Sequence, residues 1–259
     1  MPMLNINGCS IHFNVRGEGV PIIFIHPPTL TSVNFDYQLE ELSKNFQVIT
    51  FDIRGHGKSQ PSLEPITYQL IVEDIKRLLD HLEINKALIA GYSTGGSIVL
   101  EFLLTSKERA LGGIVISGMS EVSDVILKNR ILLAVKLAKA GAISVLSLSI
   151  SWSNSNHLKL FNKMSSEAKK GDAKNIQQYY EYSLHYNCTH RLKEINLPTL
   201  LTYGKKDKQF FKYAQILQKN LTSSQLEFIE NVDHRIPTKA ANELNRLIQQ
   251  FTLTIGKEL

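Results

Sequence analysis

One serine of the sequence stands in a setting that could make it a nucleophile. The segment GYSTG at 91–95 has the pattern G-x-S-x-G, and it lies between two apolar segments, residues 86–91 and residues 93–106. If the first is a strand and the second a helix, the sharp turn between them lifts the Ser93 hydroxyl above the carboxyl end of the strand. The N–H of Thr94 and its neighbours in the first helical turn would then face an oxyanion formed there. We predict that Ser93 is a nucleophile; the alternative is a purely structural turn.

A serine hydroxyl attacks only when a base takes its proton, and the base needs an acid that orients it. The chain supplies both, in the order Ser93, Asp207, His234, and each of the latter two follows a short apolar run. Side chains that follow parallel strands meet at one edge of the sheet, so we predict that His234 is the base and Asp207 its acid. Asp124, after the preceding strand, is the alternative acid.

Short apolar runs rich in Ile, Val and Leu predict the strands. They are residues 21–26, 46–52, 86–91, 112–118, 198–204 and 226–232, preceded by an alternating pattern that predicts a hairpin around Gly8 and Cys9. Continuous apolar runs suit strands that are covered on both faces. Helical patterns lie between them, at 68–84, 93–106 and 237–251. The alternation predicts an α/β fold with a doubly wound, mostly parallel sheet.

Residues 119–196 interrupt this alternation. Nothing there reads as a strand, and four helical segments fill the interval. We expect a helical cap, or lid, over one sheet edge, inserted into a core domain made of residues 1–118 and 197–259. The cap carries several aromatic residues that either pack on the core or line a pocket: Trp152, Phe161, Tyr179, Tyr180, Tyr182 and Tyr186.

A further motif gives the sequence a family resemblance. FDIRGHGKS at 51–59 has the pattern D-x-R-G-x-G-x-S, which together with the serine motif resembles the α/β-hydrolase superfamily. The resemblance covers the whole chain, from the hairpin to the acid and base loops. It implies an α/β-hydrolase fold and an activity found among esterases, lipases, lactonases, carbon–carbon bond hydrolases, cofactor-free perhydrolases and a few lyases. It also implies that residues 54–57 are structural turn residues.

The loop after the first parallel strand departs from the family pattern. Similar hydrolases have His-Gly-x there, and the N–H of x is an oxyanion donor; the matching residues here are His26, Pro27 and Pro28. Pro28 has no N–H, so the expected donor is missing in this register. The N–H of Thr94 is intact, and we predict that the N–H or hydroxyl of Thr29 replaces the lost donor. Losing one donor outright would slow catalysis by roughly 10²–10³-fold.

These residues predict a serine hydrolase that cleaves a small lipophilic or aromatic carboxylic ester through an acyl-enzyme. The same triad could instead serve carbon–carbon cleavage or perhydrolysis. A third possibility, from a different class, is a ligand-sensing or partner-binding protein that has kept the fold and lost the oxyanion hole. An intact Ser93, Asp207 and His234 argues against it, because a binding protein does not need all three.

The composition indicates none of the usual macromolecular or metal partners, so we expect a small-molecule substrate as the binding partner. The net charge is +5 and the cations are scattered, which does not indicate nucleic acid. Cys9 and Cys188 are far apart, and His185, Cys188 and His190 lack a fourth ligand, so we expect neither a metal nor an organic cofactor. No segment resembles a signal peptide or a membrane span, so we expect a cytoplasmic protein without membrane insertion. Monomer and homodimer both remain open.

Overall fold

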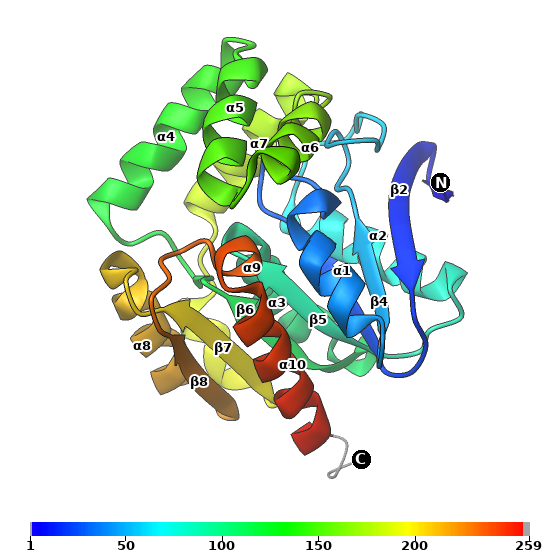
Figure 1. Cartoon of the computed structure of the whole chain (residues 1–259), viewed down its shortest axis with the longest axis vertical. Coiled ribbons are helices and arrows are strands. Elements are labelled where there is room, and N and C mark those ends of the chain that lie inside the picture. The colour runs from blue at the N-terminus through cyan, green and yellow to red at the C-terminus, as the bar shows by residue number, and fades with distance from the viewer. Residues whose placement is uncertain (1, 256–259) are drawn as a thin grey trace.

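The computed structural model describes residues 2–255, and within them eight strands form one sheet in the order β1-β2-β4-β3-β5-β6-β7-β8 (Figure 1). The strands are β1 (Met3–Ile6), β2 (Cys9–Arg16), β3 (Pro21–Ile25), β4 (Gln47–Phe51), β5 (Ala87–Tyr92), β6 (Ala110–Ile116), β7 (Thr199–Gly204) and β8 (Ser224–Ile229). Only the pairs β1–β2 and β2–β4 are antiparallel. The predicted doubly wound, mostly parallel sheet is confirmed. Residues 1 and 256–259 of the predicted core domain lie outside the described residues.

Helices cover both faces of the sheet. They are α1 (Asp36–Leu42), α2 (Tyr68–His81), α3 (Thr94–Thr105), α4 (Val125–Lys139), α5 (Ile143–Asn154), α6 (Leu158–Ala168), α7 (Ala173–His185), α8 (Phe211–Asn220), α9 (Ile236–Lys239) and α10 (Ala241–Ile255), with 3₁₀ turns at Ser32–Phe35, Lys107–Arg109, Thr189–Glu194 and Lys208–Phe210. Buried side chains of α2, α3 and α8 form one core cluster and those of α1 and α10 another. Within residues 2–255, no helix combines the length and apolarity that crossing a membrane requires.

Strand β3 shows why its apolar run is continuous. Ile23 and Ile25 belong to the cluster on one face, and Ile22 and Phe24 to the cluster on the other. All four are fully buried. A central strand with helices on both faces has no polar side, which is the pattern that the sequence displays.

The helix predicted at 237–251 is in fact two helices. Ala240 leaves the helical conformation (φ −139°, ψ 41°) and separates α9 from α10. Two carbonyls of α9 accept hydrogen bonds from side chains instead of from the next helical turn. Gln38 Nε2 donates to Pro237 O (3.1 Å), and Asn156 Nδ2 donates to Thr238 O (3.2 Å). These donors come from distant segments, which a local helical pattern does not reveal.

The chain between β6 and β7 forms α4, α5, α6 and α7, which lie together above the sheet (Figure 1). We call these four the cap helices. Helices α4, α5 and α7 share a small apolar cluster of their own, which includes Ile131, Leu146 and Ile176. That they form a distinct cap domain over residues 119–196 remains our proposal.

The loop at 51–59 is held by buried charges and hydrogen bonds. Asp52 accepts hydrogen bonds from the backbone N–H of Ser32 (2.8 Å) and of Lys58 (3.0 Å), and its carboxylate lies 3.1 Å from His12 Nδ1. Burial opposes ionisation, but these bonds prevail and lower the pKa of Asp52 to about 2. Arg54 follows in the same loop and makes a buried bidentate ion pair with Asp74, with both N–O distances at 2.7 Å.

Two histidines of these loops are fully buried. His26 Nε2 accepts a hydrogen bond from the N–H of Ile53 (2.9 Å), which ties the loop after β3 to the loop after β4. His56 Nδ1 lies 3.0 Å from Arg54 O, which makes it a donor to this carbonyl. Burial lowers the pKa of His26, and it lowers the pKa of His56 to about 3. Both imidazoles are therefore neutral in the folded protein.

This burial predicts acid sensitivity of the fold. The unfolded chain takes up a proton on His56 near pH 6.5, whereas the folded protein takes it up only near pH 3, so the free energy of unfolding should fall as the pH falls from about 6.5 towards 3. The lowered pKa of His26 acts in the same direction. Each histidine contributes up to about 1.4 kcal/mol per pH unit. Urea unfolding at several pH values from about 5 upward, where a carboxyl with an unfolded pKa of 3.8 is ionised in both states, should give a shallower slope for His56→Gln and an unchanged slope for exposed His190→Gln. Equal slopes in all three proteins would contradict this account.

Candidate functional site

The turn between β5 and α3 has the strained geometry that the serine motif predicts. Ser93 lies between these elements with φ 56° and ψ −121°, a conformation that non-glycine residues rarely adopt. Its N–H donates to Ile116 O at 2.8 Å and holds the turn against β6. A Cβ atom on Gly95 would lie 2.3 Å from Ile25 O, and one on Gly91 would lie 2.2 Å from Gly95 O. Glycines at these positions let α3 approach the strands closely enough to form the turn.

The structure brings Ser93, Asp207 and His234 together in one hydrogen-bonded chain. His234 Nε2 lies 3.0 Å from Ser93 Oγ, and His234 Nδ1 lies 2.8 Å from Asp207 Oδ2. With the proton on Nδ1, the ring donates to the carboxylate and accepts from the hydroxyl. The three residues follow β5, β7 and β8, three parallel strands whose carboxyl ends meet at this edge. The arrangement is one in which the hydroxyl proton can pass to an oriented base.

Asp124, the alternative acid, does not contact His234. It caps α4, where its carboxylate accepts hydrogen bonds from Leu127 N–H (2.8 Å) and Gln209 Nε2 (2.9 Å). Tyr213 OH donates to its other oxygen. These contacts explain Asp124 as a helix cap.

Two aromatic rings pack against the His234 ring, and an ion pair flanks His234 in the sequence. The Phe210 ring centroid lies 4.2 Å from that of His234, and the Tyr92 centroid lies 5.3 Å from it. On either side of His234 in the sequence, Asp233 and Arg235 form an ion pair. Hydrogen bonds from Arg235 lower the pKa of Asp233 to about 2. Asp233, the second carboxylate near His234 after Asp207, is therefore ionised and already paired with Arg235.

The proline loop after β3 lies against the nucleophile. Pro27 and Pro28 line the same cavity as Ser93 and Thr94, and Pro28 has no N–H to offer there. The N–H of Thr94 lies in the first turn of α3, where the helix has no acceptor for it. The Thr94 hydroxyl is also buried and has no hydrogen-bond partner among the described residues.

Two tyrosines of α7 hold this loop in place. Tyr179 OH donates to His26 O (2.9 Å), and Tyr180 OH lies 3.4 Å from Pro28 O and 3.1 Å from Thr29 Oγ1. Thr29 has φ 69° and does not line the cavity. Its hydroxyl, one of the two donors that the sequence suggested, is therefore turned towards Tyr180. The sequence does not predict that these tyrosines hold the loop, because it does not show which distant carbonyls their hydroxyls reach.

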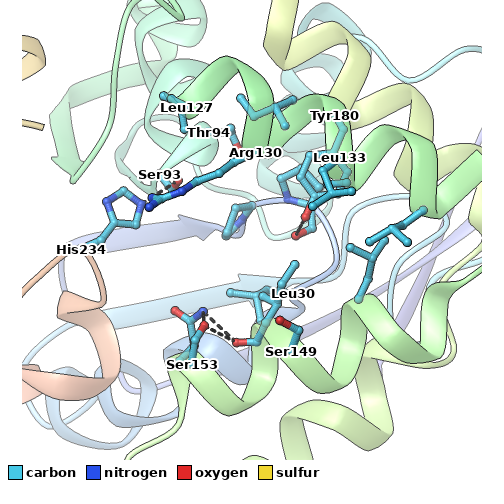
Figure 2. A pocket seen from close by; sticks show the side chains of 18 of the residues that line it. Leu30, Ser93, Thr94, Leu127, Arg130, Leu133, Ser149, Ser153, Tyr180 and His234 are labelled. Carbon is cyan, nitrogen blue, oxygen red and sulfur yellow. Dashed lines mark hydrogen bonds between the residues drawn. The ribbon is translucent and has the colours of Figure 1, made fainter. Parts of the chain in front are cut away.

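A cavity of about 540 Å³ extends from Ser93 and His234 between α4 and α5 (Figure 2). Most of its lining is apolar: Pro27, Pro28, Leu30, Met119, Leu127, Ile131, Leu133, Ala134, Leu137, Val145, Leu146 and Ile150. Arg130 is the cation in this lining, and sequence reasoning did not single it out. Of the aromatic cap residues, Tyr180 lines the cavity, whereas Trp152 is 67% exposed. The described residues contain no cluster of three or more His, Cys, Asp or Glu side chains able to hold a metal ion.

Known proteins similar to this chain share the α/β-hydrolase fold. Residues 20–141 match the sequence model of the family described as alpha/beta hydrolase fold. Two Bacillus subtilis proteins are similar: AB hydrolase superfamily protein YisY (26% identity, 91% of this chain and 92% of that protein) and a putative 2-succinyl-6-hydroxy-2,4-cyclohexadiene-1-carboxylate synthase (25%, 95% and 96%). A structure from a study of carboxylesterases of Nitrososphaera gargenis has a TM-score of 0.85 at 19% identity, over 100% of both chains. The fold implied by the resemblance is confirmed.

The close approach of α3 predicts the effect of a methyl group at Gly95. Gly95→Ala should destabilise the protein by about 1–3 kcal/mol and displace Ser93, because the methyl would overlap Ile25 O. The matched control is Gly8→Ala, where a Cβ has no neighbour within 4 Å and only the positive φ costs about 1 kcal/mol. Thermal unfolding and the reactivity of Ser93 towards a phosphonate should both change in Gly95→Ala, and only unfolding in Gly8→Ala. Normal reactivity in Gly95→Ala would contradict the packing argument.

Proposed function

Since the chain belongs to the α/β-hydrolase superfamily, we propose that it is a serine hydrolase in which Ser93 attacks the carbonyl carbon of a carboxylic ester. The observation that carries the proposal is the continuous hydrogen-bonded chain from Ser93 Oγ through His234 to Asp207, at 3.0 Å and 2.8 Å. Ser93 and His234 line an apolar cavity, which gives a substrate carbonyl a route to the hydroxyl.

The proposed reaction has two halves. As Ser93 Oγ bonds to the carbonyl carbon, His234 Nε2 takes the hydroxyl proton, and the Asp207 carboxylate stabilises the imidazolium that forms. His234 then gives this proton to the departing alcohol oxygen, which leaves an acyl group on Ser93. In the second half His234 Nε2 takes a proton from water as the water oxygen attacks the acyl carbon. His234 then returns this proton to Ser93 Oγ, and the carboxylic acid leaves.

The oxyanion of each tetrahedral intermediate needs donors in place before the reaction. The N–H of Thr94 is the first. For the second, the N–H of Thr29 remains a candidate, whereas the Thr29 hydroxyl is bonded to Tyr180. The unpartnered Thr94 hydroxyl is a further candidate because, unlike Thr29, Thr94 lines the cavity. A second donor of this kind would allow the proline loop to coexist with catalysis.

Cavity size and lining favour a lipophilic or aromatic ester. A volume of about 540 Å³ with a mostly apolar wall suits a small acyl or aryl group and offers few partners to a strongly polar one. Burial of each methylene in such a wall stabilises the bound state by about 0.8 kcal/mol.

Two other classes of function would give different outcomes in the tests below. Carbon–carbon cleavage or perhydrolysis could use the same triad, and a similar Bacillus subtilis protein is named as a putative synthase. A ligand sensor without catalysis would retain the fold and not an activated serine.

A phosphonate probe tests the nucleophile directly. Fluorophosphonate should label the wild-type protein rapidly, and Ser93→Ala and His234→Ala should both abolish labelling. Ser149→Ala is the matched serine control, because Ser149 lines the same cavity without a histidine partner, and His190→Ala is the histidine control. Folded wild-type protein that does not react would overturn the hydrolase proposal and favour the sensor.

A series of p-nitrophenyl esters tests the substrate class. The value of kcat/KM should rise about fourfold with each methylene added to a short acyl chain, until the cavity is full. Ser93→Ala should lower kcat on the order of 10⁴-fold or more. Mass spectrometry should find the carboxylic acid as product and a transient acyl group on Ser93. A labelled serine that releases no acid from any ester would point instead to one of the other triad reactions.

A further inference from the structure

The cap helices have an unusual charge balance. Between residues 125 and 166 there is no Asp or Glu, and there are six cations: Lys128, Arg130, Lys136, Lys139, Lys159 and Lys163. This segment thus carries +6, whereas the whole chain carries +5. Lys163 pairs with Asp36, but the other five make no ion pair with any described residue. Arg130 lines the cavity and donates to Gln209 Oε1 (3.2 Å), so Lys128, Lys136, Lys139 and Lys159 are the cations available to an external partner.

Exposed apolar side chains gather on the same helices. Of the twelve large hydrophobic residues that are exposed in residues 2–255, seven lie on α4, α5 and α6: Val125, Ile126, Leu133, Val145, Leu148, Trp152 and Leu158. Single exposed apolar residues are ordinary on a protein surface, but such a concentration is typical of an interaction site. We call these seven side chains the apolar patch.

The cavity opens at this patch. Leu133 on α4 is 58% exposed and Val145 on α5 is 57% exposed, yet both also line the cavity that reaches Ser93. Figure 2 shows Leu133 and Ser149 on the two helices that flank the cavity, with Ser93 and His234 at its other end. A molecule held against the patch therefore has a direct apolar path to the nucleophile.

We propose that the apolar patch and its cations dock the protein on an anionic lipid surface, with the cavity mouth facing the lipid. Apolar side chains interspersed with an excess of cations suit an anionic bilayer interface, where each Lys or Arg gains about 1 kcal/mol. A second copy of the same patch would bring like charges together. Nucleic acid would match the charge and leave the apolar side chains against phosphate. This inference deepens the proposed function, since it makes a lipid-dissolved ester the substrate, but docking itself does not require catalysis.

Trp152 provides a reporter for the test. It is the single tryptophan of the chain, and it belongs to the apolar patch. Addition of vesicles made of phosphatidylcholine and phosphatidylglycerol in equal parts should shift its fluorescence to shorter wavelength and make the protein float with the vesicles. Vesicles of phosphatidylcholine alone should do so far less, and added salt should release the protein. Ser93→Ala should bind as the wild type does, which separates docking from catalysis.

Variants separate the two parts of the surface. Lys136→Gln with Lys139→Gln should weaken partitioning into the anionic vesicles about thirty-fold, at about 1 kcal/mol per cation. The matched control is Lys86→Gln with Lys107→Gln, because both lysines are exposed and precede β5 and β6, at the opposite end of the sheet. Ile126→Ser with Leu148→Ser should also weaken binding, and Leu253→Ser on α10 should not. Labelling by a soluble phosphonate should persist in every one of these variants, as a check that they fold.

Three results would overturn the proposal. The first is a folded wild-type protein that labels with phosphonate but does not bind the anionic vesicles. The second is equal loss of binding in the control lysine pair, which would mean attraction by net charge alone. The third is a concentration-dependent Trp152 shift without vesicles, accompanied by dimers in sedimentation, which would make the patch an interface between copies.

Discussion

The left-handed backbone of Ser93 is the constraint on which the rest of the site depends. A side chain in this conformation costs roughly 1–2 kcal/mol, so the turn persists only because its surroundings enforce it. The hydrogen bond from Ser93 N–H to Ile116 O holds it from the side of β6, and the missing side chain of Gly95 lets α3 press against the end of β3. The same contact brings the proline loop into the cavity that Ser93 and Thr94 line. Sheet register, helix position and candidate oxyanion donors are thus linked through one residue.

The proline loop, in which Pro27 and Pro28 have no N–H, is held by hydrogen bonds that the cap helices donate to its carbonyls. Its carbonyls at His26 and Pro28 face Tyr179 and Tyr180 of α7, and the His26 ring binds the N–H of Ile53 below. A loop with two consecutive prolines has few alternative conformations, so a small number of hydrogen bonds suffices to fix it. Because α7 supplies two of them, the position of the cap helices and the shape of the loop beside Ser93 depend on each other.

The sequence predicts those parts of the structure that depend on local pattern. Continuous apolar runs located the central strands, and the order Ser93, Asp207, His234 after three of them placed these side chains at one edge. The sequence does not reveal which distant groups a hydroxyl or a carbonyl meets. Thr29 faces Tyr180 across 151 positions of the chain, and the break at Ala240 is accompanied by donors from Gln38 and Asn156. Such contacts depend on how α7 and α9 pack, which no local periodicity encodes.

The cap helices meet opposite demands on their two sides. Towards the core, α4 and α5 bury Ile131 and Leu146 and line an apolar cavity, which ordinary packing explains. Towards solvent, the same helices would be expected to carry polar residues of both signs, yet α5 has no charged residue and α4 carries only cations. The exposed parts of Leu133 and Trp152, 58% and 67% of these residues, bring no stability to an isolated molecule in water, since that apolar area stays hydrated. An outer face of this composition is best explained by a partner that is itself apolar and anionic, and the open cavity mouth then lies where such a partner would deliver its acyl chains.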